Sequence, residues 1–295
     1  MQWGDLKFFL DVARQPRLEA VAAHTHVDAT TISRRIRRLE QALGLTLFER
    51  THRGHILTPA GERLAARVEA MESICLDILS ETASEQMAAG RVRLGVPEGL
   101  GTMIIAPALR EFRERHPRIE VDLIALSGFV SVPKREADMS ILLARPSAGR
   151  VKVRKITDYR LRLFGSERYV AMHGSVGSLS DLENHVLIGY VDDLIYSAQL
   201  RYFDELLPGL SPQFCSPSIL AQAQMVMAGA GLGILPVFIA DRMEGLVRIL
   251  PEEICVERTF WLAVHEDVAG LKRNRVIADF VAEKLWDMNR QLRDA

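Results

Sequence analysis

Four arginines fall within the five residues 34–38. A guanidinium group is permanently charged and pairs with phosphate through two parallel hydrogen bonds. At 100° per residue, a helix over residues 28–40 separates apolar from polar side chains. The apolar side holds Ile32, Ile36 and Leu39, and the polar side holds Thr30, Arg34, Arg37 and Arg38. This pattern predicts a cationic surface for an anionic partner, although such a run by itself is equally typical of a solvated charged face.

The positive charge is concentrated near the start of the chain. Residues 1–58 contain nine Lys and Arg against six Asp and Glu, whereas the whole chain of 295 residues has a formal net charge of −1. With 48% hydrophobic and 25% charged residues, the composition is that of a globular protein, and the length predicts about two domains. An anionic partner for the N-terminal part alone would explain the asymmetry.

Cysteine usage and hydropathy bound the cellular context. Cys75, Cys215 and Cys255 lie far apart with no CxxC spacing, which favours reduced thiols over a disulfide framework or a zinc site. The first residues, MQWGDLKFF, lack the basic and then apolar regions of a signal peptide. The uncharged apolar stretch at residues 225–240 is interrupted by glycines and is shorter than the roughly 20 apolar residues of a membrane span. We expect a cytoplasmic protein.

Three short helices are expected within the first 45 residues. Helical spacing of apolar residues over 6–13 ends before Pro16, a second helix starts at Leu18, and Asp28 is a good N-cap for a third. Two short helices joined by a tight turn, the second of them basic, form a helix-turn-helix, whose second helix reads the major groove of DNA. The residues expected to contact DNA are Ala29, Thr30, Thr31, Ser33, Arg34, Arg37 and Arg38, together with Arg50 and Arg53 in the segment that follows.

That following segment, ERTHRGHILTPAG, is expected to form a β-hairpin wing around Gly54. Its arginines would enter the minor groove or bind phosphate. Four histidines, His24, His26, His52 and His55, have spacings that are also compatible with a metal site. No cluster of carboxylates or cysteines accompanies them, so we prefer solvated histidines and expect neither a metal nor a cofactor.

A long helix with a heptad pattern is predicted from Pro59, with Thr58 as its cap. Apolar residues recur in steps of four and three, as at the a and d positions of a coiled coil. They are Leu64, Val68, Met71, Cys75 and Ile78. We interpret residues 59–90 as a linker helix that pairs two chains, in preference to a helix packed on its own domain.

The remainder alternates strands and helices, which predicts α/β lobes with a mostly parallel sheet. The run VRLGV starts one such pattern, and the pattern restarts at HVLIGYV. Two similar lobes are therefore expected, followed by an amphipathic helix from Lys272 to about Leu292.

The stretch ISRRIRRLEQALGLTLFERTHRGHILTPAGERL resembles the DNA-binding domain of LysR-type transcriptional regulators, and the likeness continues along the whole chain. The family's Ser-Arg falls on Ser33 and Arg34, its Arg-Leu-Glu on residues 38–40, and its Leu-Phe-x-Arg on residues 47–50. Many members have Ser-Gln-Pro-Ala where this chain has Asp-Ala-Thr-Thr at 28–31, so the operator sequence does not carry over. Thr30 and Thr31 are expected to make hydroxyl and methyl contacts with bases instead.

The resemblance implies an α/β protein with a winged helix-turn-helix head, a linker helix and a two-lobed effector domain built like a periplasmic binding protein. It implies a homodimer or homotetramer on an inverted-repeat operator, a small-molecule effector, and contact with RNA polymerase. We place the head at 1–58, the linker at 59–90 and the effector domain at 91–295, with lobe one at 91–162 and 266–295 and lobe two at 163–265.

Ligands of open α/β sheets bind where strands end and helices begin, which here points to the cleft between the lobes. The candidate lining residues are Pro97, Glu98, Gly99, Thr102, Ser127, Gly128, Phe129, Leu143, Arg145, Tyr190 and Asp192. Helix N-termini at Thr102 and near Ser131 would donate N–H groups to a carboxylate, although Thr102 and Ser127 are equally well explained as helix caps. The carboxylate of Glu98 argues against a purely anionic ligand.

Three other classes of function fit the sequence less well. A dinucleotide-dependent enzyme is disfavoured because neither GVPEGLG nor GAGLG is GxGxxG, and the latter follows a helix and precedes a strand. A hydrolase is disfavoured because no GxSxG motif is present. A small-molecule-binding protein without DNA binding would account for the lobes but not for the helix-turn-helix. We therefore expect a regulator rather than an enzyme.

Overall fold

The computed structural model describes residues 3–15, 17–25, 27–51, 54–65, 67–68, 71–72, 88–128, 132, 137–147, 149–206 and 208–293. The chain divides into two compact units, Met1–Gln86 and Met87–Ala295. We call the first the head and the second the effector unit. No helix in the described parts of the chain is long and apolar enough to cross a membrane.

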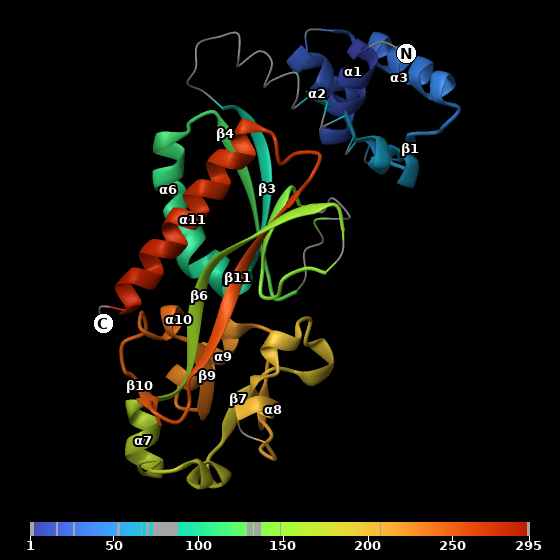
Figure 1. Ribbon diagram of the computed structural model, residues 1–295. Coiled ribbons are helices and arrows are strands. Elements are labelled where there is room, and N and C mark those ends of the chain that lie inside the picture. The colour runs from blue at the N-terminus through green and yellow to red at the C-terminus, as the bar shows by residue number, and fades with distance from the viewer. Residues whose placement is uncertain are drawn as a thin grey trace. The chain divides into compact units, whose positions relative to one another are not determined.

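The head consists of three helices and a two-stranded hairpin (Figure 1). The helices are α1 (Trp3–Arg14), α2 (Leu18–Thr25) and α3 (Ala29–Leu43), and the antiparallel strands are β1 (Phe48–Thr51) and β2 (Gly54–Leu57). Both α1 and α2 pack against α3, whose buried residues are those of the predicted apolar side, Ile32, Ile36 and Leu39. The winged helix-turn-helix predicted from the sequence is confirmed.

Helical residues resume at Pro59, immediately after Thr58. The Thr58 hydroxyl accepts a hydrogen bond from the backbone N–H of Gly61 (3.0 Å) and donates one to the carbonyl of Thr46 (2.7 Å). Beyond this cap, Val68 is 1% exposed within the core of the head, and Leu64 packs against the same core. Leu64 and Val68 were expected to face a second chain. In the structure both pack instead against the core of their own head. Met71 is exposed, and Cys75 and Ile78 lie outside the described residues.

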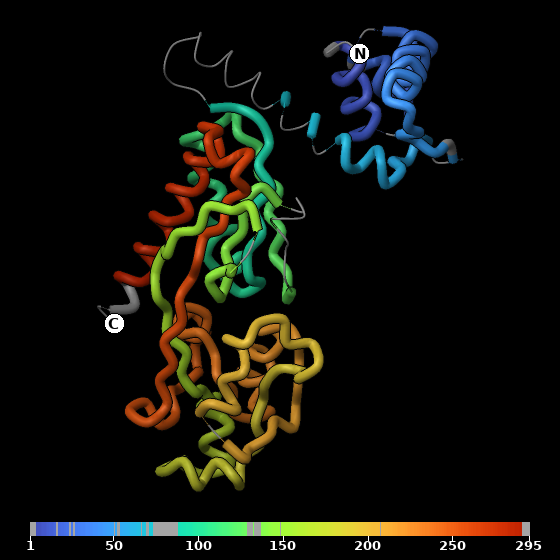
Figure 2. The backbone as a smooth tube through the Cα atoms, turned by 45° about the vertical axis from the view of Figure 1, so that its right-hand side comes forward, coloured from blue at the N-terminus to red at the C-terminus, as the bar shows by residue number. Residues whose placement is uncertain are grey.

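The effector unit is built on one sheet with the strand order β4-β3-β5-β11-β6-β9-β7-β8, and β10 pairs with β6 off this path. Lobe one contains β3 (Gly90–Pro97), β4 (Ile119–Leu126) and β5 (Met139–Leu142). Lobe two contains β7 (Leu187–Gly189), β8 (Phe214–Cys215), β9 (Leu232–Pro236) and β10 (Leu246–Ile249). Two long antiparallel strands, β6 (Val151–Ser166) and β11 (Val256–His265), run through both lobes, as Figure 2 shows.

Helices cover the sheet in each lobe. In lobe one a helix begins at Glu98, as α5 (Glu98–Leu100), a π-helical turn (Gly101–Ile105) and α6 (Ala106–Arg115), and α11 (Lys272–Arg293) lies beside α6 (Figure 1). The rings of Phe112 on α6 and Phe280 on α11 are 5.0 Å apart. The helices of lobe two are α7 (Glu167–His173), α8 (Tyr202–Leu206), α9 (Ile219–Met227) and α10 (Val237–Ala240), with 3-10 turns at Leu179–Asn184, Asp192–Leu194 and Ala198–Leu200.

The chain crosses between the lobes earlier in both strands than the sequence suggested. Leu161 of β6 already pairs with Pro236 in lobe two, and Val264 of β11 already pairs with Met139 in lobe one. The crossings therefore lie at residues 157–160 and 257–260, which face each other in the register. The proposed boundaries at 162 and 265 are corrected accordingly. Because β6 and β11 pair with each other, both must pass between the lobes at the same level of the sheet. The sequence alone does not show that these two strands pair.

Candidate DNA-binding surface and effector pocket

The N-terminus of α3 is organised by Asp28. Its carboxylate accepts hydrogen bonds from the backbone N–H of Thr31 (2.8 Å), from the Thr31 hydroxyl (2.7 Å) and from the Thr30 hydroxyl. The predicted N-cap is thus present. At the other end Gly44 closes the helix with φ 64°, a left-handed conformation that favours glycine. Because both threonine hydroxyls donate to Asp28, their methyl groups and oxygen lone pairs are what remain for the edges of bases.

The cap makes the start of α3 sensitive to acid. The hydrogen bonds from Thr30 and then Thr31 lower the pKa of Asp28 from 3.8 to about 2. Because the pKa is lower in the folded than in the unfolded state, the ionised carboxylate stabilises the fold at pH values above the unfolded pKa. This contribution is lost as the pH falls from about 4 through 2. We expect the protection of the Thr31 amide, relative to its intrinsic exchange rate at each pH, to fall over this range, and Asp28→Ala to show low protection at neutral pH already. An exchange rate in the variant equal to that of the native chain would contradict the cap.

The four arginines of α3 divide into two pairs. Arg38 donates from Nε (3.2 Å) and Nη2 to the carboxylate of Asp5 on α1, and Asp5 is 1% exposed. The guanidinium of Arg35 lies 3.7 Å from the same carboxylate and 5.0 Å from the centre of the Phe8 ring. Arg34 and Arg37 are exposed, and no ion pair joins either to another described residue. Arg38 therefore holds α3 to α1, and we propose this contact as its main role in place of the DNA contact expected from the sequence, although its side chain is 54% exposed.

Glu40 connects α3 to the wing. Its Oε1 accepts hydrogen bonds from the backbone N–H groups of Leu47 (2.7 Å) and Phe48 (3.3 Å). Within the Arg-Leu-Glu segment of α3, Arg38 contacts α1, Leu39 lies in the core of the head, and Glu40 contacts the start of the wing. Of the four arginines of α3, Arg34 and Arg37 are the two without an ion pair to another described residue.

The wing is a regular hairpin in which Arg50 pairs with His55 and Thr51 with Gly54. The side chain of Arg50 and all of Arg53 lie outside the described residues, so their DNA contacts stay predictions. The His55 ring packs edge-on against Phe48 with a centroid distance of 5.9 Å. Over the described ranges, no group of three or more His, Cys, Asp or Glu side chains could hold a metal ion.

A pocket lies where the two lobes meet, and both lobes and both crossing strands form its wall. It contains about 460 Å³ of empty space, a volume that includes space open to solvent. Lobe one contributes Pro97, Glu98, Gly99, Leu100, Ser127 and Leu143, the crossing strands contribute Tyr159, Leu161 and Phe260, and lobe two contributes Tyr190, Tyr196, Leu200, Pro217, Ile219, Pro236, Phe238 and Ile239. Most of these residues follow the carboxyl end of a strand, as expected for a sheet of this kind.

Six of the predicted effector residues line this pocket: Pro97, Glu98, Gly99, Ser127, Leu143 and Tyr190. Gly128 and Arg145 line a neighbouring cavity that shares Pro97, Leu143 and Tyr196 with the first. Phe129 and Ser131 lie outside the described residues.

Two of the effector candidates, Thr102 and Asp192, line neither cavity. Thr102 is exposed inside the π-helical turn rather than at a helix N-terminus, because the helix already begins at Glu98. Asp192 is exposed, pairs with Arg201 at 2.5 Å, and lines neither cavity.

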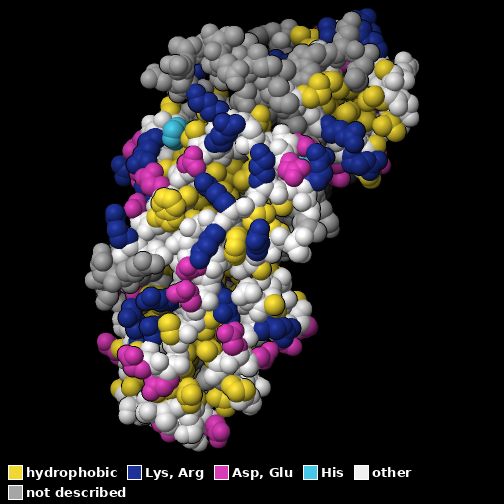
Figure 3. All heavy atoms as spheres, viewed as in Figure 1, with side chains coloured by type: hydrophobic (Ala, Val, Ile, Leu, Met, Phe, Trp, Pro, Cys, Tyr) yellow, Lys and Arg dark blue, Asp and Glu magenta, His cyan; other side chains and the backbone are white. Residues whose placement is uncertain are grey.

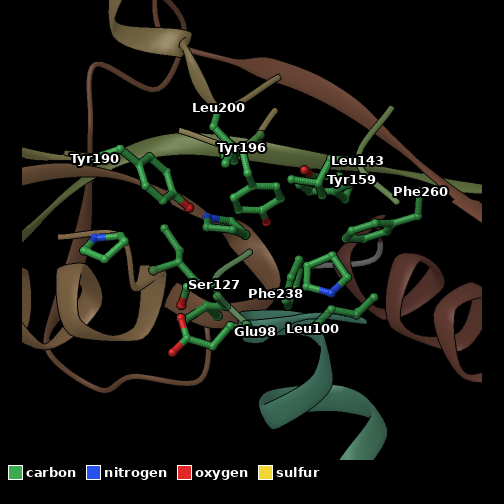
Figure 4. A pocket seen from close by; sticks show the side chains of 17 residues that line it. Glu98, Leu100, Ser127, Leu143, Tyr159, Tyr190, Tyr196, Leu200, Phe238 and Phe260 are labelled. Carbon is green, nitrogen blue, oxygen red and sulfur yellow. The ribbon is translucent and has the colours of Figure 1, made fainter. Parts of the chain in front are cut away.

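Apart from Tyr190, the aromatic residues of the pocket wall were missed by sequence reasoning. The rings of Tyr159 and Phe260 stack with a centroid distance of 4.1 Å and an interplanar angle of 11°, and Phe238 meets Tyr159 edge-on at 6.0 Å. Figure 4 shows Tyr190 and Tyr196 on the opposite side of the cavity from Glu98, with both hydroxyl groups directed toward the interior. Tyr159 and Phe260 lie on the crossing strands β6 and β11. The alternation of apolar and polar residues along these strands does not distinguish them as pocket residues.

The tyrosines of the pocket are neutral at physiological pH. Burial, and the nearby Glu98 carboxylate, raise the pKa of Tyr196 to about 12. Burial raises the pKa of Tyr159 and of Tyr190 well above 10. Their hydroxyl groups can therefore donate or accept hydrogen bonds without carrying charge.

The lobes touch closely at Gly99. A Cβ atom on this residue would lie 2.6 Å from Ile239 Cδ1 and 2.9 Å from Ile219 Cγ2, both of them in lobe two. The absence of a side chain lets the first turn of the lobe-one helix reach α9 and α10. The wall of the pocket is therefore formed by two lobes that also contact each other.

The surface of the effector unit differs from that of α3. On the face shown in Figure 3, acidic and basic side chains are interspersed, with ion pairs such as Arg154 with Asp279 (3.1 Å). Between α6 and α11, Lys284 pairs with Glu111 at 2.7 Å. Paired charges of this kind are screened by salt and contribute little to attraction of an anionic polymer. The unpaired arginines of α3 are the better candidates for that role.

A winged helix-turn-helix head joined to a two-lobed α/β unit with an interlobe pocket defines a DNA-binding transcriptional regulator with an effector-binding domain. Two family models match the chain: "Bacterial regulatory helix-turn-helix protein, lysR family" over residues 3–62, and "LysR substrate binding domain" over residues 85–286. The chain belongs to the LysR family of transcriptional regulators.

Individual relatives agree with this assignment. The HTH-type transcriptional regulator CrgA of Neisseria meningitidis serogroup C is 26% identical over 296 residues, covering 95% of this chain and 96% of that protein. The crystal structure of CrgA from Neisseria meningitidis has a TM-score of 0.60 at 24% identity and covers 97% of this chain and 99% of that one. ArgP from Mycobacterium tuberculosis has a TM-score of 0.68 at 16% identity, with coverage of 95% and 96%. The last two likenesses concern the fold.

Proposed function

We propose that this regulator binds an inverted-repeat operator as a dimer or tetramer, and that a small molecule in the interlobe pocket changes its affinity for that operator. The observation that carries the proposal is the composition of the pocket wall, to which both lobes and both crossing strands contribute. A ligand that contacts both lobes stabilises one interlobe arrangement over others. An operator-binding state that differs in this arrangement then differs in affinity for the ligand, and by linkage the ligand alters affinity for the operator. Changed operator occupancy alters promoter use by RNA polymerase.

On the DNA side, Thr30 and Thr31 at the start of α3 would contact base edges, while Arg34 and Arg37 would contact phosphate. The wing arginines Arg50 and Arg53 would reach the adjacent minor groove. A dimer presents two such helices, which explains the expectation of a palindromic operator.

The exposed Met71 supports the dimer. It lies one turn beyond Val68 and continues the heptad after the residues that the head itself covers. Sedimentation equilibrium of the full chain should give a dimer or a tetramer, and Met71→Glu should weaken association, because a charge at a core position of a coiled coil must be desolvated. A native chain that is strictly monomeric at micromolar concentration would refute this part of the proposal.

The coupling is tested with DNA from upstream of the protein's own gene. Metabolites are screened for binding to the full chain, and the affinity of a labelled fragment is measured by fluorescence anisotropy with and without each ligand found. We expect at least one ligand to change DNA affinity by about 5–150-fold, the usual range of coupling. Leu143→Trp fills the pocket from its wall and should abolish the ligand effect while leaving DNA affinity unchanged. Equal ligand affinity for free and DNA-bound protein would refute the coupling.

A further inference from the structure

One carboxylate oxygen at the pocket is left without a hydrogen-bond partner. Oε1 of Glu98 accepts a hydrogen bond from the Ser218 hydroxyl at 2.9 Å. Oε2 of the same group is buried and has no partner among the residues that the structure describes. A buried carboxylate oxygen without a donor is costly, and native proteins rarely leave one unsatisfied. Glu98 is part of the pocket wall, so this carboxylate belongs to the lining that a ligand would meet.

The remainder of the pocket suits a cation with an apolar body. The wall is made of aromatic, proline and aliphatic side chains, and Glu98 is its one charged residue in the described part of the chain. Aromatic faces attract ammonium groups, most strongly where water is excluded. The Tyr190 and Tyr196 hydroxyls, directed inward in Figure 4, can accept hydrogen bonds from an ammonium group.

An anionic ligand would meet the opposite conditions. A carboxylate in this pocket would lie beside the carboxylate of Glu98 with no guanidinium or ammonium on the described wall to offset it. Arg145 lines the neighbouring cavity, where its guanidinium lies 5.6 Å from the centre of the Trp261 ring. Because the tyrosines are neutral, Glu98 sets the sign of the charge that the pocket prefers.

We propose that the effector of this regulator carries a protonated amine on an apolar, aryl-bearing body, with the ammonium group donating to Glu98 and the aryl group packing against Phe238 and Phe260. This inference rests on the proposed function, because it names the ligand class of the same pocket. It adds that the pocket selects against organic acids of similar size.

Three probes of similar size test the charge preference: 2-phenylethylamine, 2-phenylethanol and 3-phenylpropanoate. Binding of each to the full chain is measured by isothermal titration calorimetry at pH 7. We expect the amine to bind at least about tenfold more tightly than the alcohol, because a charge-assisted hydrogen bond contributes that much, and the carboxylate to bind most weakly. Tighter binding of the alcohol or of the carboxylate, or no binding of the amine at millimolar concentration, overturns the inference.

Glu98→Gln locates the preference. It keeps the size of the side chain and can still accept from Ser218, so we expect it to remove the advantage of the amine over the alcohol while leaving alcohol binding unchanged. The exposed Glu252 supplies the matched control, and Glu252→Gln should keep the native order of affinities. An amine preference that survives Glu98→Gln assigns the binding to another site and overturns the inference.

Failure of this inference is distinguishable from failure of the proposed function. Each probe is also added to the DNA-binding assay described above. If the carboxylate binds most tightly and changes DNA affinity, the effector site stands and the ligand class is wrong. If the amine binds through Glu98 and DNA affinity does not change, the ligand class stands and the coupling is wrong.

Discussion

Arg34→Ala is expected to weaken binding to all DNA sequences by about tenfold and to reduce the salt dependence of binding by about one unit in the slope of log K against log salt concentration. The side chain is exposed on α3, and no ion pair ties it to another described residue. It is therefore available to displace a counterion from a phosphate. A phosphate contact carries no base information, so the ratio of operator to non-specific affinity should stay constant.

The measurement is a series of anisotropy titrations between 50 and 200 mM salt, on an operator fragment and on a scrambled fragment of the same length. Lys152→Ala removes one exposed positive charge from the effector unit and serves as the control, with no expected change in slope. A slope for Arg34→Ala equal to that of the native chain would show that Arg34 does not contact phosphate. A selective loss of operator affinity would instead assign Arg34 to base recognition.

Local patterns in the sequence were reliable for the head. The cap at Asp28 and the apolar side of α3 depend on residues within one helix, so helical geometry alone determines them. The pairing of Arg38 with Asp5 joins residues 33 positions apart. Helical geometry places Arg34, Arg37 and Arg38 together on the polar side, but it does not show that α1 packs against that side near Arg38. The same limit applies to Val68, whose apolar spacing is equally suitable for a partner chain or for its own head.

Glycines obscured the start of the lobe-one helix. Gly99 and Gly101 disfavour a helix by propensity, and they suggested a loop that ends near Thr102. In the structure both are helical, and close contacts explain them: a Cβ on Gly101 would lie 2.5 Å from Val96 Cγ2 and 2.6 Å from the Cβ of Ala125. Tertiary packing outweighs propensity here, and the residue at the helix N-terminus is Glu98 rather than Thr102.

The pocket shows which part of a site a sequence can predict. Strand ends in a parallel sheet gather at one edge, so Glu98, Ser127 and Leu143 could be assigned from the order of strands. Tyr159 and Phe260 lie in the middle of β6 and β11, and they meet at the pocket only because those strands pair in one register. Long-range register is not encoded in the alternation of either strand alone.

Arg38→Ala should have the opposite signature to Arg34→Ala. Its removal leaves the Asp5 carboxylate, 1% exposed, without its main partner, and a buried acceptor left unsatisfied costs about 1–3 kcal/mol. Arg35, at 3.7 Å, supplies only part of the lost attraction. We expect the free energy of opening, measured by hydrogen exchange of the α1 and α3 amides, to fall by this amount, with little change in the effector unit.

Two comparisons separate this role from DNA contact. Arg37→Ala removes an exposed arginine of α3 that has no ion pair to the described residues. It should leave amide exchange in α1 unchanged. Asp5→Ala combined with Arg38→Ala should be less destabilising than the sum of the single changes, because the double variant buries no unpaired charge. At temperatures below its unfolding transition, Arg38→Ala should bind DNA with the same slope of log K against log salt concentration as the native chain. A reduced slope with native stability would instead return Arg38 to the DNA-binding surface and leave the burial of Asp5 without its proposed cause.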